Sequence, residues 1–587
     1  MSTPSNTSAF VPEVSSGPIV IFKAKKILTM DRDNPEAEYV AVRNGRILGA
    51  GTLEQVSGWG DYTLDDTFKD HVLVPGLVEA HSHIFEGMVA MMGWSGRYDR
   101  PGVNGETLKG IASYDDLITI LKAEEAQLTD PNAPLVSSGF DPIYFWDHKT
   151  TLDAAFLDQV STTRQVAVWW ANGHDMTVNS AVLKANTITS ATKVPGVLKD
   201  ANGNPTGQLN ETPAMGLART ILGPIMEMMG STEAIVALGK FAVNSGCTTI
   251  TDMASTNLAS PAAAKAWNDA VNTPAYPARV VLYADPTLPG TDATPANVVE
   301  VFKKAAAGNT DKLMYQGIKL VCDGSTQAFT AVMNWPGYYK GENDLQELLI
   351  GPEELTNWMT PLHEAGIQCS VHCNGSRTID VFLDTLSAVQ RAASWPDHRH
   401  TCQHAMWTTR AQFERMVELG AAVNIFSNHI WYWGDQHYEI VVGPERANEM
   451  AACGTARDLG LNFSFHTDAG VTPLGQLHPM WCAVNRVTPQ GRVFSDKQKL
   501  TAEEALFAAT VGAARLLKMD DRIGSIETGK FADFTVLEQN PLEVDPMKIR
   551  DIVVWGTVLG GVKQQGAGIA CIDAIAGAPA GKGSPAA

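Results

Sequence analysis

Imidazole and carboxylate side chains stand at the ends of several apolar runs in this sequence. His81 and His83 form a His-x-His pair at the end of HVLVPGLVEAHSH. Alternation along an extended chain puts both rings on one face, about 6–7 Å apart. His372 and His404 end two later runs, QCSVHCN and HTCQHAM, and Asp468 follows a third in NFSFHTDAG. A single histidine in an apolar strand is more often a packing residue, so the shared strand-end position is what marks these five as a set.

These residue types are suited to binding divalent metal ions. Imidazole nitrogens and carboxylate oxygens favour Zn²⁺, and ligand type alone does not separate zinc from Mn, Fe or Co. A catalytic zinc keeps one coordination position open for water and lowers the pKa of that water to about 7. We therefore expect one or two bound ions that supply a hydroxide nucleophile at neutral pH.

Eight short, continuously apolar runs are the elements that must position these side chains. Such runs are typical of parallel strands buried on both faces, and helical stretches such as PANVVEVFKKAAAG lie between them. Eight units of this kind predict an α/β fold of the (β/α)8 TIM-barrel type, with its active site at the C-terminal ends of the strands. Lys319 lies in the fourth run. The runs are 71–83, 247–253, 278–285, 317–324, 368–374, 400–406, 421–428 and 462–470.

Further regions surround the predicted barrel of residues 71–519. The 163 residues 84–246 are too many for one helix and predict an insertion or lid after the first strand. Residues 18–70 and 520–565 are rich in short strands, with an Asn44-Gly45 hairpin turn, and predict one composite β-sandwich from both chain ends. The Ser/Thr/Pro-rich N-terminus (1–17) is expected to be disordered and the tail (566–587) flexible.

Composition excludes several classes of partner. The 587 residues include 44 Lys and Arg against 64 Asp and Glu, a net charge of −20, so nucleic acid is not an expected partner. No run of about 18 apolar residues is present, so no membrane span is expected. The eight cysteines are scattered, and the N-terminus lacks the basic and apolar regions of a secretion signal. We expect a cytoplasmic protein with a small-molecule substrate.

The motifs of the chain resemble those of the amidohydrolase superfamily. The resemblance spans about residues 18–565 and is closest to the amidohydrolase-3 or YtcJ-like branch, which includes N-substituted formamide deformylases. It implies a distorted barrel packed beside the composite β-sandwich, and a homodimer is compatible with it. The motifs, whose joint order is more specific than any one of them, are PGLVEAHSH, GHDMTVNSAVL, GNPTGQLNE, GCTTITD, GIKLVCDGS, QHA, HTDAG and GSIETGKFADFTVLEQNPLEV.

The resemblance also implies roles for the metal ligands. His81, His83 and Asp468 hold the more buried ion, and His372 and His404 hold the second. Lys319 is expected to be carboxylated and to bridge the two ions, since an ammonium group cannot ligate a cation. The alternative is an uncarboxylated lysine that binds substrate or pairs with Asp323, in which case the site holds one ion. By analogy, Asp468 takes a proton from the attacking water and delivers it to the leaving amine.

Substrate contacts are expected from the insertion and from the loop after the seventh strand. His174 or Asn179 could hydrogen-bond the substrate oxygen, and Glu211 could order the mouth of the site. Trp431 and Trp433 lie in a run of three aromatic residues that suggests a flat apolar wall for a hydrophobic group. The alternative interpretation is lid structure for the first three residues, and lid packing or an oligomer contact for the two tryptophans. His466, two residues before Asp468, is interpreted mainly as a packing residue.

The sequence thus predicts a metal-dependent hydrolase of a non-peptide C–N bond. An N-substituted formamide, N-acyl amine or urea with a hydrophobic group is the expected substrate. One alternative keeps the site and changes the bond, to an ester, lactone or cyclic imide, or to ring deamination. Another is a non-catalytic binding protein on the same scaffold, which the complete ligand set argues against.

Overall fold

The computed structural model describes residues 17–146, 150–286, 293–341, 343 and 346–570. Except for residue 17, the predicted disordered N-terminus lies outside the described residues, as does 571–587 of the predicted tail. Residues 566–570 are not a flexible tail. They belong to strand β23 (Val562–Ala570), because Val553 and Val554 of β22 (Val553–Leu559) pair with Ala570 and Ile569.

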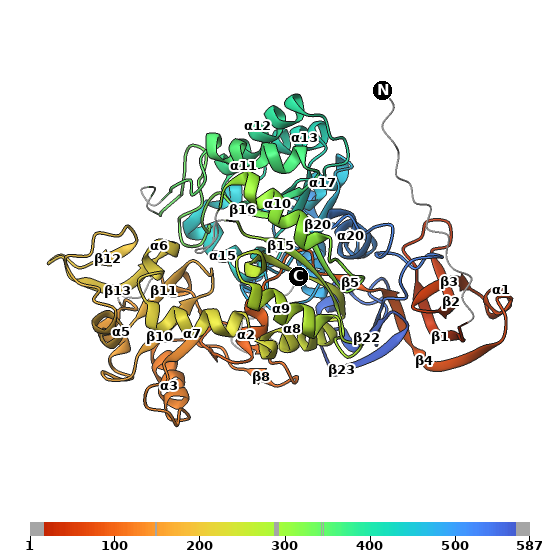
Figure 1. The fold of residues 1–587 in the computed structure, drawn as a ribbon, viewed down its shortest axis with the longest axis horizontal. Helices are drawn as coiled ribbons and strands as arrows, with labels where there is room; N and C mark the ends of the chain where they lie inside the picture. Colours follow the sequence, from red (N-terminus) through yellow and green to blue (C-terminus); the bar gives the residue numbers. More distant parts are fainter. Residues whose placement is uncertain (1–16, 147–149, 287–292, 342, 344–345, 571–587) are drawn as a thin grey trace, which may run out of the picture.

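A parallel eight-stranded sheet forms the centre of the molecule, with neighbours in the order β20-β19-β18-β17-β16-β15-β14-β5 (Figure 1). A parallel bridge between Ser82 and Ala469 joins the chain after the first strand to the chain after the last. The backbone N–H of Asp468 donates to the His81 carbonyl at 3.1 Å in the same place. The predicted barrel is confirmed, with strands β5 (Leu77–Val78), β14 (Cys247–Ser255), β15 (Arg279–Ala284), β16 (Leu313–Val321), β17 (Gln368–Cys373), β18 (Thr401–His404), β19 (Ala422–Ile425) and β20 (Phe463–Phe465).

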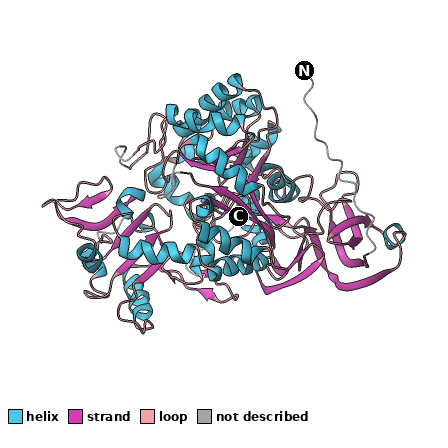
Figure 2. Ribbon diagram, in the orientation of Figure 1, coloured by secondary structure: helices cyan, strands magenta, loops and turns pink. Residues whose placement is uncertain are grey.

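Helices surround these strands, as Figure 2 shows. Sequence signals set their ends: the Ser231 hydroxyl accepts from Ala234 N–H at the start of α8, and Gly246 ends it at φ +79°. Strand β14 follows directly, so α8 belongs to the barrel although it falls within 84–246. The larger helices are α8 (Thr232–Ser245), α9 (Pro261–Val271), α10 (Pro295–Ala306), α11 (Pro352–Glu364), α12 (Ser376–Ala392) and α13 (Arg410–Leu419).

After β19 the chain forms short helices. Helices α14 to α17 lie between β19 and β20, and α18 to α20 follow β20. Their bounds are α14 (His429–Tyr432), α15 (Gly434–Gln436), α16 (Pro444–Asn448), α17 (Cys453–Asp458), α18 (Leu477–Asn485), α19 (Ala502–Phe507) and α20 (Ala513–Leu516).

Both chain ends build the second sheet, as the sequence predicts. Its seven strands form one continuous sheet in the order β23-β22-β21-β4-β1-β2-β3. The predicted hairpin turn is confirmed: Asn44 and Gly45 have φ of +50° and +75°, and Arg43 pairs with Arg46. Phe22, Phe68 and Phe534 lie in its buried core. The remaining bounds are β1 (Ile19–Leu28), β2 (Glu36–Arg43), β3 (Arg46–Gly51), α1 (Leu53–Ser57), β4 (Tyr62–Pro75) and β21 (Phe534–Leu537).

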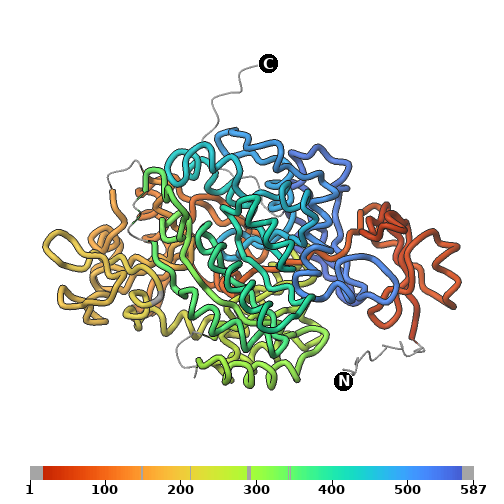
Figure 3. Tube along the Cα trace, turned by 90° about the horizontal axis from the view of Figure 1, so that it is seen from above, coloured from red at the N-terminus to blue at the C-terminus, as the bar shows by residue number. Residues whose placement is uncertain are grey.

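The insertion contains a sheet of its own, in the order β12-β13-β11-β10-β9-β6. Figures 1 and 3 show it at the opposite end of the molecule from strands β1–β4. Its elements are α2 (Phe85–Val89), β6 (Gly93–Trp94), β7 (Arg100–Pro101), β8 (Thr107–Leu108), α3 (Tyr114–Glu125), β9 (Leu135–Phe140), α4 (Ala154–Leu157), β10 (Val166–Trp170), β11 (Asp175–Val178), α5 (Ser180–Ala185), β12 (Val197–Lys199), β13 (Pro205–Asn210), α6 (Glu211–Met215) and α7 (Arg219–Met229).

Within the described part of the chain, no single helix has the length and apolar character that a membrane span needs. One bent pair, α7 and α8, meets the test only when the two helices are taken together, with a 60° bend between them.

Candidate metal centre

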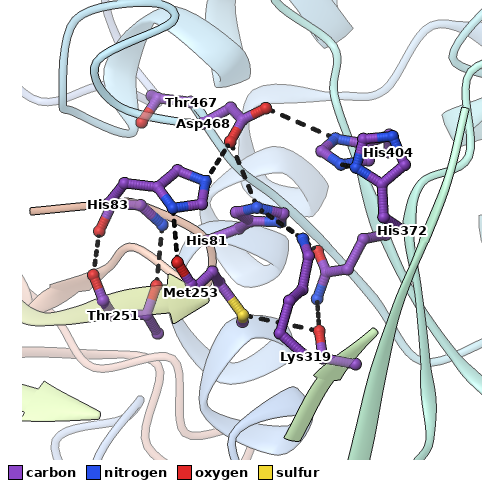
Figure 4. Close-up of polar contacts among 12 residues, drawn as sticks. His81, His83, Thr251, Met253, Lys319, His372, His404, Thr467 and Asp468 are labelled. Atoms are coloured by element: carbon purple, nitrogen blue, oxygen red, sulfur yellow. Dashed lines mark hydrogen bonds and ion pairs between the residues drawn. The ribbon is translucent and has the colours of Figure 1, made fainter. Parts of the chain in front are cut away.

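Side chains from the two ends of the closed barrel sheet meet at one point (Figure 4). The Nε2 atoms of His81 and His83 lie 3.2 and 2.9 Å from the same carboxylate oxygen, Oδ1 of Asp468. Two ligand atoms bound to one zinc at about 2.0–2.1 Å in tetrahedral geometry lie about 3.3 Å apart. The three atoms therefore have the spacing of a metal-ligand set, and the residues present fit a divalent ion.

Hydrogen bonds on the far side of each ring orient these two histidines. His81 Nδ1 donates to Oε1 of Gln403 at 2.7 Å, and His83 Nδ1 donates to the Met253 carbonyl at 2.6 Å. Gln403 in turn donates from Nε2 to Ser370 Oγ at 2.7 Å. A proton held on Nδ1 leaves Nε2 with a free electron pair, which is the arrangement that metal-binding histidines need.

The backbone at the mouth is shaped to present the ligands. His404 and Asp468 have φ of +70° and +52°, a left-handed conformation that costs free energy for residues other than glycine. Glu79 lies beneath them, fully buried, and accepts from His81 N–H and from the Thr467 hydroxyl. Burial raises the pKa of Glu79 to about 8. Through its hydrogen bonds to His81 and Thr467, Glu79 ties the end of the first strand to the end of the last.

The two remaining histidines lie on the other side of Asp468. His404 Nε2 is 3.0 Å from His372 Nδ1, and His404 Nδ1 is 3.7 Å from Oδ2 of Asp468. Lys319 Nζ lies 3.1 Å from His81 Nε2, and burial lowers the pKa of this lysine to about 8. The structure thus brings all six predicted ligands together.

Lys319 does not pair with Asp323 within the described part of the chain. The Asp323 carboxylate instead accepts from the N–H groups of Asn374 and Gly375 and from the Thr378 hydroxyl. These bonds hold the turn after β17. The alternative pairing considered from the sequence is therefore wrong.

His466 lies inside the ligand cluster. Its ring stacks on His81 with centroids 4.6 Å apart, and it is fully buried. Neither of its ring nitrogens has a hydrogen-bond partner among the described residues, and it forms a possible ligand group with His81 and His404. The interpretation of His466 as a packing residue missed its position among the ligands. The signal was present, because residues two apart in a strand, His466 and Asp468, share a face.

His174 and Glu211 reach the same site from the insertion. His174 Nδ1 is 3.0 Å from Oε2 of Glu211, and its ring meets the His372 ring edge-on at 5.8 Å. Burial opposes protonation of His174, but the hydrogen bond and charge of Glu211 outweigh it, so the pKa of His174 is raised. Of the contacts expected from the insertion, these two are in place.

The structure does not bring Asn179 to this site. Asn179 is the N-cap of α5, where its Oδ1 accepts from Val182 N–H, and its Nδ2 donates to the carbonyls of Ser161 and Arg164. Every polar atom of this buried side chain is used inside the insertion. Its expected substrate contact is therefore a structural contact.

The two tryptophans after β19 also lie outside the metal cavity. Trp431 packs against Trp481 and the Arg550 guanidinium. The Trp433 indole N–H donates to Asp141 Oδ2 at 2.9 Å. The chain turns into α14 here and carries both rings away from the ligands, so the predicted aromatic wall does not line the metal cavity.

A cavity of about 270 Å³ lies over the ligands. Its lining combines polar groups, among them the histidines, Lys319 and Asp468, with apolar side chains. The sequence missed most of the apolar members, because they come from the insertion and from strand ends distant in the chain. The apolar members are Ile84, Phe85, Trp169, Met226, Met229, Met253, Val321 and Val471.

Comparison with known proteins gives matches along nearly the whole chain. A family model described as "Amidohydrolase family" matches residues 69–563. Protein LONG AFTER FAR-RED 3 of Arabidopsis thaliana is 25% identical over 532 residues, which are 88% of this chain and 86% of that protein. These findings confirm the resemblance that the motifs indicate.

Two bacterial relatives are similar at the same level. The putative amidohydrolase YtcJ of Bacillus subtilis is 24% identical, over 91% of this chain and 97% of the relative. The N-substituted formamide deformylase of Arthrobacter pascens is 23% identical, over 91% and 96%. Among solved structures, a metal-dependent hydrolase from Pyrococcus furiosus matches with a TM-score of 0.66 and 19% identity, covering 89% of this chain and all of that one. This last match supports the fold.

Proposed function

Because the chain belongs to the amidohydrolase family and is a metal-dependent hydrolase, we propose that it cleaves a non-peptide C–N bond, in an N-substituted formamide, N-acyl amine or urea with a hydrophobic group. The observation that carries the proposal is the lining of the cavity. His81, His83 and Asp468 converge in it, and apolar side chains line the same cavity. A small acyl group would lie beside the ligands while the apolar substituent of the amine packs on the apolar side chains.

The donor set fits zinc. His81, His83 and Asp468 would hold one ion, and His372 and His404 a second, with His466 close to both groups. When bound, such an ion polarises the carbonyl and lowers the pKa of water. Manganese, iron and cobalt are served by the same ligands.

Asp468 is the proton carrier of the proposed reaction. The neighbouring His81 and His83 outweigh the effect of burial and hold its pKa well below the usual range, so the carboxylate is ionised and free to accept. It takes the proton of the attacking water and gives it to the amide nitrogen as the C–N bond breaks. The products are an amine and a carboxylic acid, or an amine and a carbamic acid when the substrate is a urea.

Lys319 is suited to carboxylation. Because burial lowers its pKa to about 8, an appreciable fraction of the side chain is neutral amine near neutral pH. The neutral amine adds to carbon dioxide and loses one proton, which forms a carbamate with two oxygens. At the position of Nζ, 3.1 Å from His81 Nε2, these oxygens would lie among the ligands of both groups.

His174 lines the same cavity and would hold the substrate from the insertion. Glu211 fixes its ring through Nδ1, so Nε2 is the atom left to meet a polar group of the substrate. The raised pKa favours the protonated form, which donates a hydrogen bond to the carbonyl oxygen.

Amine release from a panel of N-benzyl and N-aryl formamides, acetamides and ureas tests the proposal. Mass spectrometry would follow the free amine, with metal-loaded protein and chelator-treated protein side by side. We expect chelator-sensitive release, fastest from the formamides because the formyl group is the smallest acyl group. No release from protein of measured metal content would contradict the proposal.

A further inference from the structure

A small second chamber adjoins the metal cavity. Ala171 and Val471 line both spaces, so the two meet at these side chains. The chamber has a volume of about 20 Å³, which is enough for one water-sized polar group. Its walls include Trp94, Tyr98, Arg100, Tyr144, Tyr432 and Trp433.

Arg100 provides unpaired donors in the wall of this chamber. It is 1% exposed, and its Nη2 donates to Oε1 of Glu86, itself 1% exposed, at 2.5 Å. Among the described residues, its Nε and Nη1 have no hydrogen-bond partner. A buried donor without a partner destabilises the fold, so these two N–H groups carry a cost that a bound acceptor would remove.

Tyr432 provides a hydroxyl in the same wall. Its backbone carbonyl accepts from Tyr144 Oη at 2.8 Å, and Tyr98 packs edge-on against its ring. The Tyr432 hydroxyl is buried and has no partner within the described part of the chain. It can accept or donate one hydrogen bond.

The charge at Arg100 is already compensated, because Glu86 neutralises its guanidinium. At the edge of the chamber Lys109 pairs with Asp99, and the partly exposed Arg97 donates to the Ile111 carbonyl. An added carboxylate would find no uncompensated charge at Arg100. A hydroxyl fits better, because its oxygen accepts from Arg100 while its hydrogen is donated to Tyr432 Oη.

We propose that this chamber is a subsite for a hydroxyl group at the far end of the substrate's amine substituent. The substituent would leave the metal cavity between Ala171 and Val471 and place its hydroxyl against Arg100 and Tyr432. The inference rests on the proposed function for the position of the amine, and it names the amine class: amines whose substituent ends in a phenol.

Calorimetric titration of the metal-loaded protein with product-like amines tests the subsite without turnover. The probes are 4-hydroxybenzylamine and tyramine against benzylamine and phenethylamine, with 4-(aminomethyl)benzoic acid as the anionic probe. We expect at least one hydroxylated amine to bind about tenfold more tightly than its plain partner, as two hydrogen bonds of ordinary strength predict. The benzoate should show no gain.

Two variants locate the effect. Tyr432→Phe removes one hydroxyl and should abolish most of the preference, and the Arg100→Met, Glu86→Gln double variant removes both charges together and should abolish the rest. Tyr338→Phe is the matched control, since that buried hydroxyl donates to the Ala331 carbonyl elsewhere and its loss should leave the preference unchanged.

Equal dissociation constants for hydroxylated and plain amines would overturn the proposal and leave the chamber as a site for a water molecule only. A preference that survives Tyr432→Phe, tighter binding of the benzoate, or no measurable binding of any amine would overturn it as well. A hydroxyl preference in a protein that hydrolyses none of the amides would support the subsite and refute the proposed reaction, so the two failures are distinguishable.

Discussion

Two histidine clusters lie at opposite ends of strand β18. At its start, His398 and His400 pack with His363 of α11, and at its end His404 lies among the ligands. Both clusters are buried, and burial lowers the pKa of His398, His400 and His404 alike. Composition and burial therefore do not distinguish them.

Hydrogen bonding does distinguish them. At the start of the strand every ring nitrogen has a partner: His363 Nδ1 meets His400 Nε2 at 2.9 Å, and the others bond to backbone groups of Cys369, Ala393, His400 and Leu419. At the end, the nitrogens converge on one another and on Asp468, and both of His466 are without partners among the described residues. The first cluster is complete by itself, and the second leaves ring nitrogens that could bind a cation.

Loss of a ligand at the C-terminal end should have the largest effect. In His83→Ala or Asp468→Ala we expect kcat/KM to fall at least about 10³-fold, because each variant loses a metal ligand and Asp468→Ala also loses the proton carrier. Metal content by mass spectrometry and the circular dichroism spectrum would be measured beside the rate. His400→Ala should keep its metal and its activity per folded molecule. Full activity in both ligand variants would contradict the assignment.

Acid should destabilise the protein through the other cluster. Burial lowers the pKa of His398 from 6.5 to about 4, so the unfolded chain binds the proton more readily than the folded one. The stabilisation is complete above pH 6.5 and is lost as the pH falls to 4, by about 3 kcal/mol. Urea unfolding at pH 7, 5.5 and 4.5 would measure it.

The control for this pH dependence is His398→Asn, compared with the parent in a background that lacks His83 and Asp468, so that metal release does not contribute. The difference in unfolding free energy between the two proteins should shrink by that amount on acidification. A difference that does not change with pH would show that His398 is not the titrating group.

A hydrogen bond behind a ligand should have a smaller effect. Gln403→Leu removes the acceptor of His81 Nδ1, and loss of such a partner weakens metal affinity about 10- to 100-fold. Competition with a chelator of known affinity would measure the change. The matched control is Gln368→Leu at the start of β17, where the amide bonds to the Arg399 and Leu516 carbonyls. It should lower stability and leave metal affinity unchanged.

The smallest effect is expected where the sequence suggested a substrate contact and the structure places a helix cap. Asn179→Ala removes the N-cap of α5, which is worth about 1 kcal/mol of stability. KM and kcat should not change, whereas Glu211→Gln should alter KM through His174. Thermal unfolding and steady-state kinetics test both, and a raised KM in Asn179→Ala would return this residue to the site.

Local patterns were sufficient for the strands and for the ligands that end them. Continuous apolar runs predicted β14 to β20, and Asn44-Gly45 predicted the first hairpin, because burial and turn geometry act over a few residues. Trp431 and Trp433 were misplaced because three aromatic residues in a row do not say which way the chain turns after β19. Trp169 and Met226 were missed because the insertion folds over the mouth from far along the chain.

The sequence by itself determined the barrel and its ligand types, since alternation and apolar periodicity are written in neighbouring residues. Only the tertiary structure decided which polar side chains were already satisfied. Asn179 and His400 find partners within the fold, whereas His466 and Arg100 retain polar atoms without partners among the described residues. The physical reason is that a buried polar atom is satisfied only when it has a hydrogen-bond partner. Most of these partners lie on distant segments that only folding brings together.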